Sequence, residues 1–387
     1  MTPDFSQGPD ALVRLLESKG VLIDPAWRDA FVNVPRHRFV PDVIWPRDTH
    51  DPAWRVPVTS DSDEWCSWVY DDYALITQVD DGTPEGLDGR GRYPTSSASQ
   101  PSLVALMLQA LRVRGGERVL EVGTATGFNC ALLCHRLGAD RVTSIEIDSS
   151  LAEQGRANLA ALGYRPHLVV GDGAKGVPER APFDRVLATV AAREVPWAWV
   201  EQTRPGGTVV APWATTYFAA GLVRLDVREG AAHGRFIGAA AFMLLRDQRA
   251  AKGSIWDFVD EKSAGVESYR GRFDPSPLSA DIAGLDLAVG VLVPGLAYRR
   301  FNAKDGSGEA SVYAYDRAGS WGLIEYEPNA NEYEAYRFGP RDLWAEVHHA
   351  CAWWERAGRP GRERFGLTVN PDGQTVWLDS PGRPVGS

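Results

Sequence analysis

Short apolar runs alternate with longer amphipathic stretches through the middle of the chain. Runs of roughly four to eight residues rich in β-branched side chains predict strands, and apolar positions at helical spacing predict helices. The pattern predicts strands over 118–122, 141–147, 168–170, 183–190 and 206–212, and helices over 102–111, 128–137 and 150–163. Regular alternation of this kind predicts an α/β fold with a parallel, doubly wound sheet, whose ligands bind where the strands end.

The segments on either side of this region have other patterns. Before it, helices are expected over 9–19 and from Pro25, with a loop-rich stretch over 46–94. After it, further strands are expected over 222–227 and 238–245, then hairpins over 310–327 and 365–378 around a helix over 340–358. The chain is therefore divided into an N-terminal helical segment with a substrate-side loop (1–94), the doubly wound domain (95–246), a linker (247–270) and a C-terminal α+β domain (271–387).

The composition is that of an ordinary globular protein, and the charge disfavours one class of partner. Of the 387 residues 44% are hydrophobic and 24% are charged, and the net charge is −10. An acidic chain is poorly suited to nonspecific binding of a phosphate backbone. The N-terminus lacks the basic and apolar regions of a secretory signal, and no apolar run is long enough to span a bilayer. We expect a cytoplasmic protein without a nucleic-acid or membrane partner, and nothing indicates its oligomeric state.

The cysteines predict neither a disulfide framework nor a metal site. Cys130, Cys134 and His135 fall on one predicted helix. A structural zinc site would need another ligand, and none lies nearby in the sequence. Packing of the helix against the sheet is the expected role, and no metal is expected.

A glycine-containing turn, Glu121-Val-Gly-Thr-Ala-Thr-Gly127, lies between a predicted strand and a predicted helix. This is the context in which glycines form a ligand-binding turn. Gly123 permits the sharp bend of the backbone, and Gly127 permits a close approach of helix and strand. The middle position of the turn is Ala125, so the backbone is expected to lie slightly farther from its ligand there.

Acidic residues at the ends of successive strands indicate which ligand the turn holds. Glu146 ends the second strand and could hold the ribose hydroxyls of a dinucleotide or of S-adenosylmethionine. Glu121 is unfavourable beside the pyrophosphate of a dinucleotide but suits the ammonium group of S-adenosylmethionine, the methyl donor. Asp172 could accept a hydrogen bond from an adenine amino group. These features favour S-adenosylmethionine as the cofactor. A nucleotide-dependent oxidoreductase and a noncatalytic binding module are the alternatives.

Eight short motifs follow one another between about residues 20 and 215: NVPRHRFVP, VYDDYALI, SSASQPSLVALM, RVLEVGTATGFNCALL, SIEID, GDGAKG, APFDRVLATVA and GGTVVAP. In this order they resemble the protein-L-isoaspartate O-methyltransferases. The resemblance implies a class I (Rossmann-like) methyltransferase domain over 95–246, with S-adenosylmethionine as cofactor. It also implies that the methyl acceptor is an aspartyl or isoaspartyl carboxylate of a peptide.

The resemblance assigns roles to individual residues. Ser99 and Asp72 are implied to lie beside the reacting carboxylate as catalytic residues, and Gln100 to bind the substrate. The hydroxyls of Ser96 and Ser97 can orient a carboxylate without neutralising it, and capping of the next helix explains them equally well. The donor site is expected to contain Glu121, Gly123, Thr124, Ala125, Gly127, Glu146, Ile147, Gly171, Asp172 and Gly173.

Some features depart from the minimal enzymes of that family. The loop between Asp72 and Ser99 is longer, the serines are more numerous, and a C-terminal domain is added. These departures resemble a subgroup that methylates an aspartate in ribosomally made, modified peptides (lanthipeptides, lasso peptides and graspetides), whose ester then closes to an aspartimide and can open to isoaspartate. A modified precursor peptide is therefore the expected partner, recognised by the C-terminal domain. The alternatives are a general isoaspartate repair enzyme, a small-molecule carboxyl methyltransferase and a noncatalytic peptide-binding module.

Overall fold

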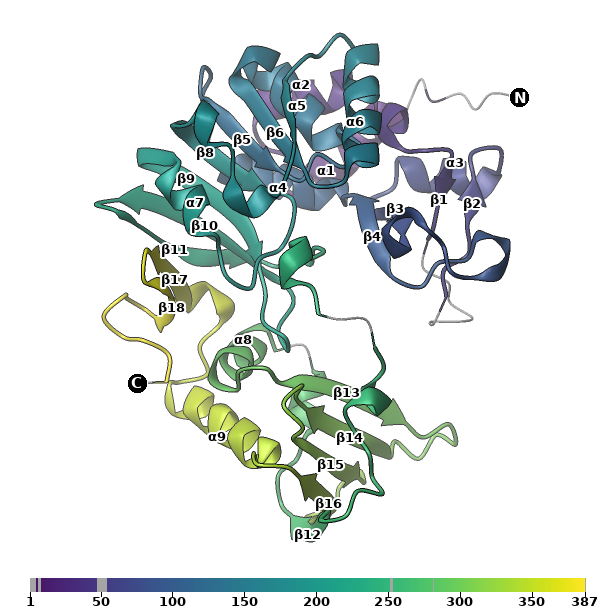
Figure 1. Ribbon diagram of the computed structural model, residues 1–387, viewed down its shortest axis with the longest axis vertical. Coiled ribbons are helices and arrows are strands. Elements are labelled where there is room, and N and C mark those ends of the chain that lie inside the picture. The colour runs from purple at the N-terminus through teal and green to yellow at the C-terminus, as the bar shows by residue number, and fades with distance from the viewer. Residues whose placement is uncertain (1–4, 6–7, 47–53, 251–252, 281, 387) are drawn as a thin grey trace.

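A mixed nine-stranded sheet forms the centre of the molecule, and a smaller five-stranded sheet forms a second lobe (Figure 1). The computed structural model describes residues 5, 8–46, 54–250, 253–280 and 282–386. The strand order of the large sheet is β18-β17-β11-β10-β9-β8-β5-β6-β7. Its strands are β5 (Val119–Val122), β6 (Val142–Glu146), β7 (His167–Val170), β8 (Phe183–Ala188), β9 (Thr203–Trp213), β10 (Gly221–Arg228), β11 (Ala231–Gly238), β17 (Phe365–Asn370) and β18 (Gly373–Leu378).

The parallel half of this sheet confirms the expected class I methyltransferase fold. Strands β5 to β9 are parallel to one another, as the alternation of strands and helices predicts. Buried leucine, valine and phenylalanine side chains from the sheet and from the helices beside it form one hydrophobic cluster. The helices of this cluster are α1 (Gly8–Ser18), α2 (Pro25–Asn33), α4 (Pro101–Ala110), α5 (Phe128–Leu137) and α6 (Ser149–Ala161). The short α7 (Trp197–Glu201) packs into a second cluster that also contains residues of the C-terminal lobe.

The antiparallel half differs from the expectation in two places. The apolar run over 238–245 does not form a strand, because β11 ends at Gly238 and the following residues line a pocket. The hairpin β17–β18 does not stay with the C-terminal lobe, since β17 pairs with β11 over Ala232–Arg235. The expected separate unit over 271–387 therefore contributes two strands to the large sheet. The division of the chain into domains otherwise stays a prediction, and part of the expected linker (251–252) lies outside the described residues.

The N-terminal segment adds a small layer beside the parallel strands. It contains β1 (Val43–Ile44), β2 (Val58–Thr59), α3 (Asp63–Val69), β3 (Leu75–Val79) and β4 (Pro94–Ala98). The strands β3 and β4 pair antiparallel as a two-stranded sheet that is not part of the large one. This hairpin carries the hydroxyl-rich sequence, so the fold places those residues on a strand ahead of α4.

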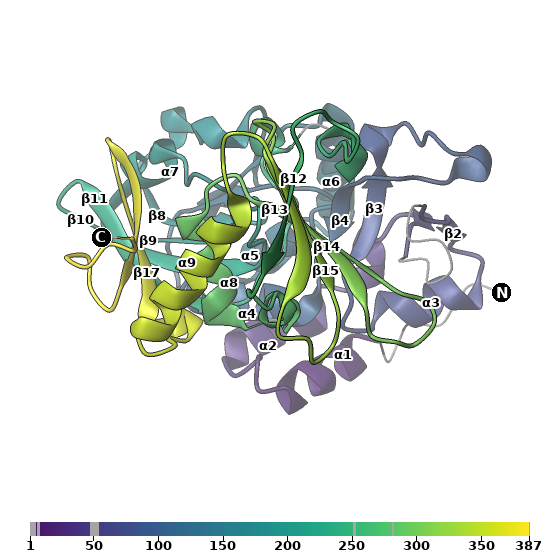
Figure 2. The same ribbon diagram turned by 90° about the horizontal axis from the view of Figure 1, so that it is seen from below.

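The C-terminal lobe packs against the large sheet through two helices (Figure 2). Its sheet has the order β12-β16-β15-β14-β13, and one hydrophobic cluster continues from it to the large sheet. Within the described residues, no helix has the length and apolar character needed to cross a bilayer. The elements of the lobe are β12 (Glu267–Gly271), α8 (Ala283–Leu292), β13 (Ala297–Asn302), β14 (Ala310–Tyr315), β15 (Trp321–Tyr326), β16 (Tyr333–Phe338) and α9 (Leu343–Arg356).

Candidate active site

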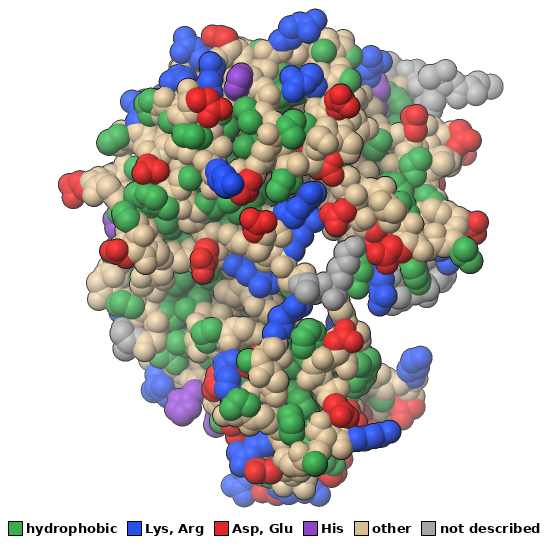
Figure 3. Space-filling view, viewed as in Figure 1, with side chains coloured by type: hydrophobic (Ala, Val, Ile, Leu, Met, Phe, Trp, Pro, Cys, Tyr) green, Lys and Arg blue, Asp and Glu red, His purple; other side chains and the backbone are tan. Residues whose placement is uncertain are grey.

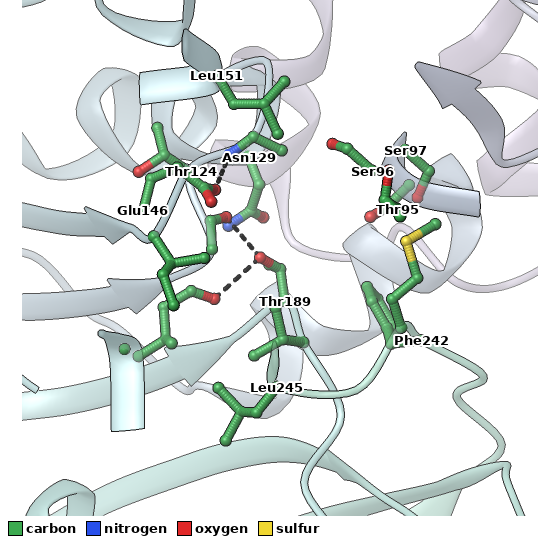
Figure 4. Close-up of a pocket in the computed structure, with 18 of the residues that line it drawn as sticks. Thr95, Ser96, Ser97, Thr124, Asn129, Glu146, Leu151, Thr189, Phe242 and Leu245 are labelled. Carbon is green, nitrogen blue, oxygen red and sulfur yellow. Dashed lines mark hydrogen bonds between the residues drawn. The ribbon is translucent and has the colours of Figure 1, made fainter. Parts of the chain in front are cut away.

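A pocket lies between the carboxyl ends of the parallel strands and the hydroxyl-rich strand β4 (Figure 4). In the close-up, Thr124, Glu146 and Leu151 lie on one side, and Thr95, Ser96 and Ser97 lie on the other. We call these sides the donor wall (residues 122–126, 128–129, 145–147, 151, 172–173 and 189–190) and the acceptor wall (residues 95–99). Some residues of each wall were expected at a site from the sequence, and the fold brings the two walls to one cavity.

The glycine turn after β5 has the conformation that its sequence requires. Gly123 has a φ of +98°, and a Cβ at this position would lie 2.7 Å from the Thr189 Oγ1 atom. Ala125 lines the pocket with a φ of +45°, which is an uncommon conformation for an alanine. Gly127 lies outside the pocket lining, contrary to the expectation that it belongs to the donor site, and it permits a close approach to helix α6. A Cβ on Gly127 would lie 3.2 Å from the carbonyl oxygen of Gly155.

Glu146 is fixed at the end of β6 with its carboxylate at the pocket. The Ala125 N–H donates to its Oε2 at 2.9 Å, and the Asp148 N–H donates to its Oε1 at 3.1 Å. Each oxygen therefore keeps a second lone pair for hydroxyl donors such as those of a ribose. Ile147 and Leu151 lie beside it in the lining and offer apolar surface to a flat base. Glu146 therefore lies at the pocket as expected, and its role in holding a ribose stays a prediction.

Asp172 and Gly173 form the next part of the donor wall. Asp172 Oδ1 accepts from the Ala174 N–H at 2.9 Å, and Oδ2 makes no hydrogen bond to any described residue. Gly173 gives room, because a Cβ there would lie 2.6 Å from the Val122 Cγ1 atom. Gly171 lies outside the lining; its N–H donates to the Glu146 carbonyl at 2.8 Å. One carboxylate oxygen thus remains for an exocyclic amino group.

Glu121 does not face the pocket, contrary to the expectation that it lies near a ligand's ammonium group. Its side chain is fully buried behind the turn. Asn129 Nδ2 donates to Oε1 at 2.6 Å, and Ser144 Oγ donates to Oε2 at 2.6 Å. Burial raises the pKa of Glu121 to about 7, although these two hydrogen bonds oppose the increase. Glu121 therefore fixes Asn129, which itself lines the pocket.

The acceptor wall presents hydroxyl groups that are not used for helix capping. Ser97 and Ser99 make no side-chain hydrogen bond to any described residue, and both line the pocket. Ser96 is more buried and accepts a hydrogen bond from Thr77 Oγ1 at 3.3 Å. The residue that precedes α4 is Gln100, and its side chain makes no capping bond either. The capping explanation for the serines is therefore wrong, and their hydroxyls are available to a ligand.

Asp72 and Gln100 lie behind the acceptor wall rather than in the pocket, which corrects the expectation for both. Asp72 Oδ1 accepts from the Ser102 N–H at 2.8 Å, and Lys19 Nζ forms an ion pair with Oδ2 at 2.5 Å. Burial alone would raise the pKa of Asp72, but these bonds outweigh it and hold the pKa below its usual value. A carboxylate satisfies the free N–H groups at a helix N-terminus, so Asp72 caps α4. Gln100 Nε2 also donates to Asp72, at 3.3 Å.

Arg36 supports the acceptor wall from outside the pocket, a role that the sequence did not predict. It belongs to the motif NVPRHRFVP and is fully buried. Burial lowers its pKa to about 10, so it remains protonated at neutral pH. Its guanidinium fixes the chain that forms the acceptor wall. It donates to five carbonyl oxygens, those of Val69, Asp71, Tyr73, Ala98 and Ser99.

A third side of the pocket comes from the segment after β11, which we call the strap (residues 239–249). Phe242, Leu245 and the two neighbouring residues between them line the pocket where a strand was expected. The strap is fixed to the loop after β8, because the Leu245 N–H donates to the Ala191 carbonyl at 2.9 Å. Arg246 and Arg249 also line the pocket. Their positive charges were not expected there from the sequence.

Comparison with known proteins identifies relatives of the central region. The sequence model of the family "Protein-L-isoaspartate(D-aspartate) O-methyltransferase (PCMT)" matches residues 65–249. A protein-L-isoaspartate O-methyltransferase of Opitutus terrae is 37% identical over 213 residues, which are 55% of this chain and 75% of that protein. One from Methanopyrus kandleri is 34% identical over 211 residues, which are 54% of this chain and 77% of that protein.

The fold of the whole chain also has a counterpart among solved structures. A structure titled protein-L-isoaspartate O-methyltransferase aligns with a TM-score of 0.54 and 22% sequence identity. The alignment covers 96% of this chain and all of the other chain. The likeness at this identity concerns the fold, and it extends beyond the central sheet into the C-terminal lobe.

Proposed function

The chain belongs to the protein-L-isoaspartate O-methyltransferase family, and from this premise we propose that it methylates the free carboxylate of an isoaspartyl residue in a peptide or protein. As a member it is an S-adenosylmethionine-dependent carboxyl O-methyltransferase. The observation that supports the proposal is one pocket lined both by Glu146 of the donor wall and by Ser99 of the acceptor wall. A methyl donor and a carboxylate held on these two walls would face each other.

The donor wall fits S-adenosylmethionine by its own chemistry. Each carboxylate oxygen of Glu146 accepts one hydrogen bond and can accept another from a ribose hydroxyl. Asp172 Oδ2 accepts none from the described residues and can accept from the adenine amino group. Asn129 and Thr124 add polar groups toward the turn, where the backbone bends at Gly123. When bound, S-adenosylmethionine supplies an electrophilic methyl group on a sulfonium.

The acceptor wall has to orient the substrate rather than activate it. A carboxyl group with an ordinary pKa near 4 is ionised at neutral pH and is itself the nucleophile, so no general base is required. Catalysis then depends on proximity and orientation, which can supply about 7–11 kcal/mol. The hydroxyls of Ser97 and Ser99 can donate to one carboxylate oxygen while the other attacks. Neutral donors leave more electron density on the attacking oxygen than a lysine in contact with it would.

The narrower hypothesis concerns an aspartate in a ribosomally made, modified peptide. The features that favour it are the hydroxyl-rich strand β4 and the long connection between β3 and β4. The added C-terminal lobe does not separate the two hypotheses, because a structure titled as a protein-L-isoaspartate O-methyltransferase aligns over nearly the whole chain. In the narrower case, the nitrogen of the next residue attacks the ester carbonyl, the new C–N bond closes a succinimide, and methanol leaves with the amide proton. General action on isoaspartate therefore has the stronger support.

The test uses two linear peptides that differ only in an isoaspartyl or an aspartyl linkage. The purified protein with S-adenosylmethionine should methylate the isoaspartyl peptide, detected as a mass gain of one methyl group. Methylation of neither linear peptide, together with methylation of a macrocyclic precursor followed by loss of methanol, would favour the narrower hypothesis. Failure to bind S-adenosylhomocysteine in a calorimetric titration would contradict both and support a noncatalytic module.

Ser99→Ala tests the role of the acceptor wall. We expect kcat/KM to fall roughly 100-fold, because an oriented hydrogen-bond donor at a reacting group commonly contributes that much. The affinity for S-adenosylhomocysteine and the unfolding midpoint should stay unchanged, because Ser99 Oγ bonds to no described residue. Ser102→Ala, in the first turn of α4, is the matched control and should keep most of the activity. An unchanged kcat/KM in Ser99→Ala would reject the assignment.

A further inference from the structure

We propose that Arg246 and Arg193 select peptides that carry acidic side chains next to the acceptor carboxylate. The proposal rests on the proposed function, because it concerns the remainder of the same peptide. It follows from arginines that lie at the mouth of the pocket and beyond it, although the chain as a whole has a net charge of −10.

Arg246 lies in the pocket lining without a hydrogen bond from its guanidinium to any described residue. Its nearest acidic partners are Asp148 at 3.6 Å and Asp81 at 3.9 Å, and its side chain is 38% exposed. Asp148 does not depend on this contact, because Ser150, Leu151 and Gln78 already donate to its two oxygens. The donors of Arg246 are therefore available to a second carboxylate at the pocket mouth.

Arg249 differs from Arg246, although it lies only three residues farther along the strap. Its guanidinium forms an ion pair with Asp81 at 3.1 Å and donates to the Thr95 carbonyl at 3.3 Å and the Leu244 carbonyl at 3.2 Å. These contacts fix the strap to the acceptor wall. Arg249 is therefore a positioning residue, and Arg246 is the cation of this pair that a substrate can reach.

Arg193 adds a second positive charge outside the pocket, beyond Arg246. The strap lies against it, because the Arg193 N–H donates to Gln248 Oε1 at 2.5 Å and the Arg193 carbonyl accepts from Gln374 Nε2 at 2.5 Å. The Nε of Arg193 is buried and has no hydrogen-bond partner among the described residues. Burial lowers the pKa of Arg193, and the nearby positive charge of Arg317 lowers it further. An anion beside the Arg193 guanidinium would offset this unfavourable charge.

The surface has a form that suits a peptide leaving the pocket. Figure 3 shows a hollow between the two lobes, and Lys and Arg side chains gather along its edges. Arg246 lies at the pocket, and Arg193 lies on the loop after β8. Arg317 lies on the turn between β14 and β15, and its guanidinium is 5.0 Å from the ring centroid of Phe258. A peptide whose carboxylate is held by the acceptor wall can place its flanking residues along this path. Glutamate or aspartate side chains near Arg246 and Arg193 would satisfy guanidinium donors of these two residues that a neutral peptide leaves unpaired.

The test compares two isoaspartyl peptides that differ only in whether the flanking residues are glutamate or glutamine. For the natural protein we expect roughly tenfold higher kcat/KM for the glutamate peptide, mainly through a lower KM. The preference should decrease as the salt concentration rises, since screening weakens exposed charge pairs. In Arg246→Gln and in Arg193→Gln the ratio of kcat/KM between the glutamate and the glutamine peptide should fall toward one, and this ratio, not the absolute activity, is the readout.

Arg228→Gln is the control. Arg228 is exposed at the last residue of β10, and β10 is antiparallel to β9, so Arg228 lies at the end of the sheet away from the pocket. This substitution removes the same charge and should keep the full preference. Equal kcat/KM for the two peptides, or a preference that both pocket-side variants retain, would overturn the inference while the proposed function stands. Methylation of neither peptide would overturn the proposed function and, with it, this inference.

Discussion

The two walls of the pocket are held in place in different ways. On the donor wall, backbone N–H groups of the turns that follow the parallel strands fix the ligating groups: Glu146 accepts from the Ala125 and Asp148 N–H groups, and Asp172 accepts from the Ala174 N–H. On the acceptor wall, distant segments fix β4 and the turn after it, because Arg36 binds the Ser99 carbonyl and Arg249 binds the Thr95 carbonyl. The donor wall is thus a local consequence of strand and turn, and the acceptor wall depends on the tertiary fold. Substitutions can therefore test the donor wall and the acceptor wall one at a time.

The largest effect is expected from Arg36→Met, which should destroy the acceptor wall. Five carbonyls lose their donor, and each buried acceptor without a partner costs about 1–3 kcal/mol before relaxation. We expect the free energy of unfolding to fall by about 3 kcal/mol or more in urea titrations, and methylation to be lost. Arg38→Met, two residues away in the same motif, is the control. Equal midpoints for the two variants would contradict the assignment of Arg36.

Glu121→Gln, behind the donor wall, should change how the free energy of unfolding depends on pH. Because the pKa of Glu121 is raised to about 7, the folded protein binds more protons than the unfolded chain between about pH 4.5 and pH 7. The natural protein should therefore lose stability as the pH rises through this range, by up to about 3 kcal/mol. The variant cannot ionise and should lack this loss, as measured by unfolding at pH 5 and at pH 8. Parallel pH profiles of the two proteins would refute the prediction.

Glu146→Gln tests the donor wall at its ligand-binding face. Replacing one carboxylate oxygen by an amide group leaves a single acceptor oxygen, where the structure already supplies two backbone donors. We expect the affinity for S-adenosylhomocysteine to fall by about 2 kcal/mol, which is roughly 30-fold, in a calorimetric titration. Glu153→Gln on helix α6 should bind as the natural protein does. A variant with full affinity would show that Glu146 does not contact the donor.

Asp72→Asn should give the smallest effect, because the helix keeps part of its cap. The amide oxygen can still accept from the Ser102 N–H, but the ion pair with Lys19 is lost. We expect a loss of about 1 kcal/mol at neutral pH. The pKa of Asp72 is lowered, so its contribution is present above the pKa of the unfolded chain and disappears on acidification. The difference between the two proteins should therefore shrink as the pH is reduced from 7 to 3, and a constant difference would contradict this assignment.

Features that depend on short stretches of sequence could be predicted. The helix over 128–137 has the expected bounds, and the parallel strands lie where β-branched runs occur. Glu146 and Asp172 were placed correctly at the pocket because a residue after a parallel strand always reaches the same edge of the sheet. Their binding roles stay predictions. Ser99 lies in the lining as the family motif implies, and its role is likewise a prediction.

Features that depend on which way a side chain faces could not be predicted. Glu121 lies next to the glycine turn in the sequence, but alternation along the strand directs it into the core. Asp72 lies in a family motif, and only the fold shows that it caps α4 from outside the pocket. The run over 238–245 has the composition of a strand because its apolar side chains cover a cavity. Arg36 gave no sequence signal apart from its motif, since its partners are carbonyl groups, which every residue carries.

The pairing of β17 with β11 determines how the C-terminal lobe could be deleted. The chain leaves the large sheet after β11, forms the lobe, and returns to the neighbouring position, so the lobe is an insertion between adjacent strands. A stop codon after Gly253 would remove β17 and β18 as well and expose the backbone N–H and C=O groups of β11. Such an open edge invites pairing between copies and precipitation. An internal deletion that joins residue 253 to residue 361 through a glycine linker long enough to span the distance between them would keep both strands and bypass the lobe.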